Sequence, residues 1–130
     1  MAINCNTGYS ELVKKGVGEA SDAFTYVAIG TGTGQTATST TLAAETVVSG
    51  LARAAATSTS ETTTVTDDTM QWVKTWTNGG ATTVITEFGV FNNAVKDAGD
   101  MMMYAELSPS ASLPITSTLT ITAKTQIKAD

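Results

Sequence analysis

Histidine is absent from this chain of 130 residues, and cysteine occurs once, at Cys5. Histidine is the commonest general base and the commonest metal ligand, so its absence removes the usual starting point for catalysis and for a metal site. A single cysteine cannot form an internal disulfide, and it leaves a zinc site without its usual ligands. We therefore expect no enzymatic activity, no cofactor and no metal.

Basic residues are also scarce. Seven Lys and Arg stand against twelve Asp and Glu, which gives a net charge of −5, and Lys14-Lys15 is the only adjacent basic pair. Nucleic acids and anionic membrane surfaces both require clustered positive charge. No apolar run approaches the roughly 20 residues of a spanning helix, and the N-terminus lacks the pattern of a signal peptide. The sequence predicts no nucleic-acid partner, no membrane partner, and synthesis in a cytoplasm.

Threonine, by contrast, is abundant, with 26 copies. Its branched Cβ suits a pleated strand better than a helix, and its hydroxyl keeps that surface wettable. Alternating or β-branched segments separated by turn residues predict strands in six regions, namely residues 24–31, 51–65, 70–77, 82–92, 101–107 and 115–128. With no crossover helix between them, these strands predict a mainly all-β fold, an antiparallel β-sandwich or open β-barrel.

The N-terminal region has a different pattern. Residues 1–8 are short and polar and predict an arm, and Ser10 can cap a short helix that ends at Gly16. So short a helix must dock its Leu12 and Val13 face on the domain or on a neighbouring subunit. We divide the chain into an arm and helix over residues 1–18 and one β domain over residues 19–130.

The segment 82–92 is the expected central strand, with apolar residues on both faces. By simple alternation Ile85 shares a face with Glu87 and Phe91. Gly89 predicts a bulge, a bend or a close backbone approach. Glu87 lies among apolar neighbours, and we expect it to pair with a lysine or with backbone amides. The turn residues at 78–80 predict a hairpin that joins this strand to the one before it.

Two other patterns suggest binding chemistry only weakly. The glycine repeat from Gly30 to Gly34 follows a strand, but it departs from the phosphate-binding spacing and no long helix follows. Asp67 and Asp68 do not match a calcium loop. We interpret the first as part of a long exposed loop, with residues 32–41 as its polar tract, and the second as a solvated turn.

The aromatic and methionine residues are the better candidates for contacts. Trp72 and Trp76 share one face of a strand and either form a stacking platform or cover the sheet or an interface. Methionine adapts to irregular contacts, so Met101 and Met103 indicate an oligomer seam. The residues predicted to contact other subunits or partner proteins are Ile3, Asn4, Leu12, Val13, Trp72, Trp76, Met101 and Met103.

The order of several motifs resembles small virion proteins of tailed bacteriophages over most of residues 24–127. The residues that carry this resemblance are Ala28-Ile29-Gly30-Thr31-Gly32, Leu42 with Glu45 and Arg53, Thr86-Glu87-Phe88-Gly89-Val90-Phe91, and Leu119-Thr120-Ile121-Thr122. Similar sequences include head decoration, or cement, proteins and parts of tail fibres or collars.

The resemblance implies a structural virion protein on the capsid surface. Its expected partners are the major capsid protein, whose subunit contacts it would stabilise, and further copies of itself in a homotrimer. We expect residues 1–18 and 32–41 to make these contacts. The alternative is a tail fibre or collar component, or a receptor- or carbohydrate-binding module that uses Trp72, Trp76 and Tyr104 on an exposed face.

Overall fold

A computed structural model describes residues 2–128, which form one helix and eight strands. In chain order these are β1 (Ala2–Asn4), α1 (Asn6–Gly16), β2 (Tyr26–Gly30), β3 (Ala54–Ala55), β4 (Thr57–Glu61), β5 (Thr69–Thr77), β6 (Thr83–Phe91), β7 (Met101–Leu113) and β8 (Thr118–Gln126). No helix in this part of the chain is long and apolar enough to cross a bilayer.

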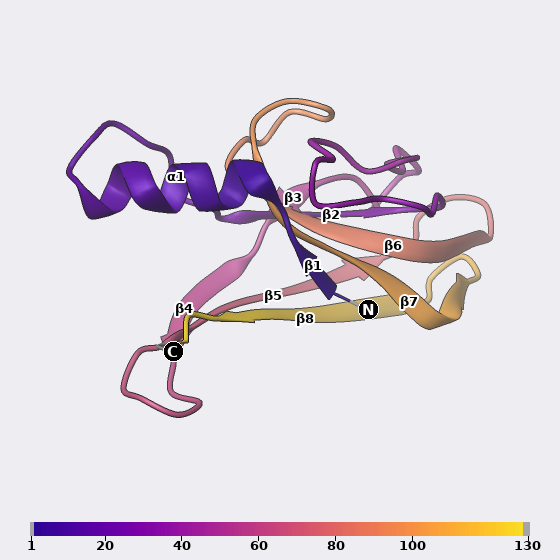
Figure 1. Cartoon of the computed structure of the whole chain (residues 1–130). Coiled ribbons are helices and arrows are strands. Elements are labelled where there is room, and N and C mark those ends of the chain that lie inside the picture. Colours follow the sequence, from indigo (N-terminus) through magenta and orange to yellow (C-terminus); the bar gives the residue numbers. More distant parts are fainter. Residues whose placement is uncertain (1, 129–130) are drawn as a thin grey trace.

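The strands form two antiparallel sheets that pack face to face (Figure 1). The five-stranded sheet has the order β1-β7-β6-β2-β3, and the three-stranded sheet has the order β4-β5-β8. Neither sheet closes on itself, so the predicted all-β sandwich with a short N-terminal helix is confirmed and the barrel alternative is not. The expected alternation of the last strand is also present, since Ile121 and Ala123 are buried while Thr120 and Thr122 are exposed.

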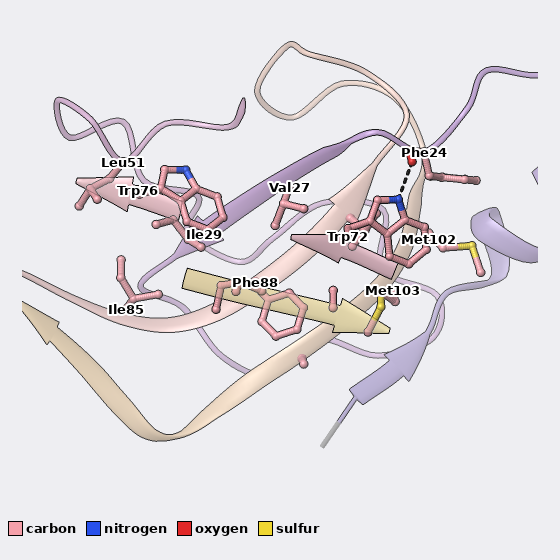
Figure 2. Packing of buried hydrophobic residues seen from close by; sticks show 14 of the residues in the cluster. Phe24, Val27, Ile29, Leu51, Trp72, Trp76, Ile85, Phe88, Met102 and Met103 are labelled. Atoms are coloured by element: carbon pink, nitrogen blue, oxygen red, sulfur yellow. Dashed lines mark hydrogen bonds between the residues drawn. The ribbon is translucent and has the colours of Figure 1, made fainter. Parts of the chain in front are cut away.

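The main core lies between the sheets. Val27, Ile29 and Val90 of the larger sheet meet Trp72 and Trp76 of the smaller one, as Figure 2 shows for the labelled side chains. Because successive side chains of a strand point to opposite faces, the neighbours of these residues must lie on the outer face of the larger sheet. That face needs a cover of its own.

The cover is the irregular segment 31–53, which runs along the side of the larger sheet away from β5 and β8 (Figure 1). Leu42 of this segment and Cys5 join a second buried cluster with Ala28, Phe91 and Tyr104. The prediction that the central strand is covered on both faces is therefore confirmed. The tract 32–41, expected to be an exposed loop, is exposed on one side only, because its other side rests on the sheet.

The expected hairpin at residues 78–80 is wrong, because β5 and β6 belong to different sheets. Asn78 is fully buried at the corner where the chain crosses between them. Its side-chain amide donates hydrogen bonds to the carbonyl oxygens of Ala81 (2.9 Å) and Leu113 (2.7 Å). These bonds give the buried backbone carbonyls at the corner hydrogen-bond partners, so the ladder between two strands that a hairpin requires is not needed there.

The strand break expected near Pro109 is also absent, since β7 continues to Leu113 with a cis Ser108-Pro109 peptide bond. The pairing of β6 with β7 shifts register between Ile85 and Glu87, opposite residues 107–110. A proline is tolerated in a strand at such an irregularity because no ladder hydrogen bond is required of its nitrogen.

The N-terminal arm is not free. Residues 2–4 form β1, which pairs with β7, and α1 begins at Asn6 rather than at Ser10. The backbone N–H of Cys5 donates to the carbonyl of Met102 at 2.9 Å, and the Thr7 hydroxyl donates to that of Met101 at 2.9 Å. Long-range pairing thus orders a segment whose own sequence carries little structural signal.

Candidate interaction surface

The two tryptophans are core residues. Trp72 is 2% exposed and Trp76 is 3% exposed, and both rings lie between the sheets (Figure 2). The Trp72 Nε1–H donates to the carbonyl of Phe24 at 2.6 Å, and that of Trp76 donates to the carbonyl of Ala52 at 3.0 Å. Tyr104 is buried as well, so an exposed aromatic platform built from these three residues is wrong.

The methionines are buried within the same chain. Met101 belongs to the outer cluster and Met103 to the main core. We expected part of this strand to lie at an oligomer seam because a small monomer has few apolar partners for both faces. The outer cluster, which includes Leu42 of the covering segment, buries Met101, and the core between the sheets buries Met103, so both side chains are covered within the chain.

The N-terminal candidates have mixed positions. Ile3 packs partly against the outer cluster, and the Asn4 side chain accepts a hydrogen bond from Thr125 and donates one to Tyr9. Leu12 packs partly against the main core, whereas Val13 is 66% exposed. Of the predicted helix face, Leu12 docks on the domain and Val13 faces outward.

An apolar stripe on the outer face of α1 was not predicted from the sequence. Tyr9 and Val13 are spaced by four residues and therefore lie on one face of α1, and Val17, the C-cap residue directly after the helix, extends the stripe by the same spacing. They are 47%, 66% and 68% exposed. The spacing was present in the sequence, but an expected helix start at Ser10 left Tyr9 outside the helix and hid the pattern.

A shallow apolar groove lies between α1 and β4. Its floor contains Leu12, Phe24, Met70 and Trp72, Lys15 stands at its rim, and its volume is about 280 Å³. The edge of β4 beside it is free of any strand partner within residues 2–128, because β4 pairs only with β5.

The buried carboxylate of Glu87 holds the covering segment in place. Its Oε1 atom accepts hydrogen bonds from the backbone N–H groups of Gly32 (3.2 Å) and Ala44 (2.9 Å), and Oε2 accepts one from Ala43 (3.3 Å). The expected pairing with backbone amides is confirmed. In the glycine repeat 30–34, the N–H of Gly32 therefore binds an internal carboxylate rather than a phosphate.

A buried ion pair fastens the other end of this segment. Arg53 donates two hydrogen bonds to Glu45, the shorter of 2.6 Å from Nη2, and both side chains are almost fully buried. The Arg53 Nη1 donates to the carbonyls of Asn93 and Ala98, and its guanidinium lies 3.7 Å from the centre of the Phe91 ring. These contacts tie two irregular segments, 31–53 and the 92–100 loop, to each other and to Phe91 at the end of β6.

The acidic turn after β4 is an internally bonded turn. The Asp68 carboxylate accepts hydrogen bonds from the N–H groups of Thr63, Thr64 and Val65 at 2.9 to 3.0 Å. These backbone bonds hold the pKa of Asp68 well below its usual range. Within residues 2–128 no cluster of three His, Cys, Asp or Glu side chains is placed to hold a metal ion.

Two carboxyl groups meet where α1 passes the 92–100 loop. Glu11 bonds to Lys14 at 2.7 Å, and this bond lowers the pKa of Glu11. Burial, followed by the neighbouring Glu11, raises the pKa of Asp100. Lys14 is the nearest compensating cation. Glu11, Lys14 and Asp100 line a polar pocket, and Asp22 lies in the same lining.

Comparisons of the chain with protein-family models, with curated proteins and with solved structures found no match.

Proposed function

We propose that this chain is a structural virion protein that decorates the outer surface of a phage head and stabilises contacts between major capsid protein subunits. The observation that supports this most directly is the apolar stripe of Tyr9, Val13 and Val17 on the exposed face of α1. The motif resemblance supplies the class of particle, and the stripe supplies a surface for contact with another protein.

The stripe is held in a fixed position. Gly8 packs so closely on β7 that a Cβ at this position would lie 2.6 Å from the Met102 Cα atom. Together with the paired strand β1, this close packing makes α1 a rigid projection from the sheet. A preorganised apolar surface loses little conformational entropy on binding. More of the transfer free energy of each side chain buried in the contact therefore remains as free energy of binding.

The buried polar groups support a structural role in a different way. Glu87 accepts hydrogen bonds from backbone amides, and Arg53 pairs with Glu45 and donates to backbone carbonyls. These contacts hold irregular segments on the sheet. A decoration protein needs a rigid, self-sufficient module that adds contact area at many equivalent positions. The same properties suit a collar or tail-fibre component, which is the alternative location.

Val13→Asp tests the proposal, with Val47→Asp as the matched control because Val47 is 71% exposed on a different segment. Burying one valine is worth about 1.5–3 kcal/mol, so we expect Val13→Asp to weaken binding to purified heads at least ~10-fold while Val47→Asp binds normally. Binding is measured by co-sedimentation with heads that lack the protein.

Equal binding by the two variants would remove α1 as the contact surface. Imaging of labelled protein on intact particles decides the location, since density on the tail or collar would replace the head assignment with the alternative.

A further inference from the structure

We propose that a second copy of this chain docks in the groove between α1 and β4, and that its docking element is the acidic turn of residues 62–68. The inference rests on the proposed function, because the resemblance behind that proposal also implies a homotrimer, and it adds the two surfaces that meet.

The groove is built to receive an apolar side chain. Phe24 and Trp72 in its floor are held by the hydrogen bond from the Trp72 Nε1–H to the Phe24 carbonyl. Leu12 and Met70 are only partly buried, so apolar surface remains open to solvent there. A volume of about 280 Å³ accommodates one branched aliphatic side chain with part of its backbone.

The turn presents such a side chain in a fixed conformation. Val65 is 64% exposed, and its own N–H is bonded to the Asp68 carboxylate at 2.9 Å. The backbone N–H of Ile127 donates to the Asp68 carbonyl at 2.8 Å and anchors the turn to the chain after β8. A turn held this rigidly can insert its apolar tip at a low entropic cost.

Charge complementarity favours a second copy as the occupant. Lys15 lines the groove, in a chain of net charge −5, whereas the neighbouring Lys14 is bonded to Glu11 at a different pocket. The turn carries Asp67, and Glu61 lies directly before it. An apolar tip with carboxylates beside it thus matches an apolar groove with the Lys15 ammonium group beside it, and such complementarity steers association and sets orientation.

The arrangement of the elements permits the contact. Figure 1 shows β4 running between α1 and the turn, and residues 58–60 of β4 line the groove, so the groove and the turn are joined by the same strand. A neighbouring chain seated there would also cover the unpaired backbone groups of β4. Depending on the relative rotation, copies joined in this way form a reciprocal pair or a ring.

Sedimentation velocity of the purified chain over a range of concentrations tests the inference without any capsid. We expect the wild-type chain to form assemblies larger than its monomer mass of 13.4 kDa. Val65→Asp and Lys15→Glu should each weaken self-association at least ~10-fold, the loss expected for one apolar side chain or one charge reversal at a contact. Val95→Asp, at a valine that is 63% exposed in another loop, is the matched control and should associate normally.

A charge swap makes the test specific. Combining Lys15→Glu with Glu61→Lys in one chain restores opposite charges across the contact, and association should recover. A wild-type chain that stays monomeric up to its solubility limit, or Val65→Asp that associates as Val95→Asp does, would overturn the inference. We expect Val13→Asp to leave self-association unchanged. Head co-sedimentation therefore tests the proposed function, and sedimentation velocity tests the self-docking inference, each without the other.

Discussion

At the scale of single residues, two acidic side chains, Asp68 and Glu106, have a negative charge that their surroundings stabilise, whereas the surroundings of Asp100 oppose its charge. Asp68 accepts three backbone N–H groups, and Glu106 accepts the N–H of Gly34 at 2.7 Å together with the Tyr104 hydroxyl. Such bonds lower the pKa of Asp68 and of Glu106. Asp100 has burial and Glu11 against its charge, so its pKa is raised.

Asp100→Asn should therefore stabilise the fold at neutral pH. The pKa of Asp100 is higher in the folded chain than in the unfolded chain, so the folded state keeps this proton to a higher pH. The contribution of Asp100 to the free energy of unfolding therefore falls as pH rises through the interval between the two pKa values. Above it the unfavourable charge is fully present. Since water screens this partly exposed site, we expect a gain of less than about 1 kcal/mol at pH 7.

Urea unfolding at neutral pH and near pH 3 measures this effect, because Asp100 is largely protonated at the lower pH and the gain should vanish there. Asp97→Asn, at an exposed position of the same loop, is the control and should show little difference between the two conditions. A gain that is equal at both pH values would mean that the Asp100 charge is not its cause.

At the scale of elements, α1 is a short helix whose position depends on close contact with β7. Eleven residues form a marginal helix by themselves, so packing must supply most of its stability. Gly8 and Gly16 lie in the same helix with opposite surroundings. A Cβ at Gly8 would meet the Met102 backbone at 2.6 Å, whereas one at Gly16 would meet nothing within 4 Å.

These two glycines give a matched pair of variants. Gly16→Ala should stabilise the chain by roughly 0.5–1 kcal/mol, since alanine loses less backbone entropy in a helix. Gly8→Ala should instead destabilise it by about 1–3 kcal/mol, because the added methyl group forces α1 away from β7. Denaturant midpoints measure both changes, and shifts of the same sign would show that α1 does not dock as described.

At the scale of the whole molecule, the fold is a sandwich with an additional irregular layer. The segment 31–53 helps to bury the outer face of the larger sheet. Side chains of β6 and β7 accept hydrogen bonds from its backbone, and its own Arg53 side chain donates to backbone carbonyls of the 92–100 loop. Glu87 provides the most buried of these contacts. The covering layer and the sheet should therefore become ordered together.

Glu87→Gln should loosen the cover. The glutamine oxygen can keep the bonds to Gly32 and Ala44, but its NH₂ group, in a fully buried position, then faces the N–H donor of Ala43 in place of the oxygen that accepted from it. We expect a loss of about 1–3 kcal/mol and faster protease cleavage within residues 33–41. Glu106→Gln, an exposed carboxylate that binds the same segment at Gly34, should have a smaller effect on both measurements. Unchanged cleavage in Glu87→Gln would show that the segment is held by its apolar contacts alone.

Local pattern determined much of the secondary structure from the sequence. The alternation of apolar and polar residues in β8, the apolar residues on both sides of β6 and the bonding of Glu87 to amides follow from residue type and spacing, which act over a few positions. The fold class follows as well, because half-buried strands without crossover helices must pack as antiparallel sheets.

Contacts between distant residues decided the rest. The register shift in β6 places Ile85 on the main-core face with Phe88, not with Glu87 and Phe91, and no local pattern shows it. The corner at Asn78 sends β5 and β6 into different sheets. Burial of Met101 required the cover from the segment 31–53, burial of Met103 required the facing sheet, and the position of α1 required β7. The physical reason is that alternation along a strand specifies two faces, while only the packed neighbours specify what each face meets.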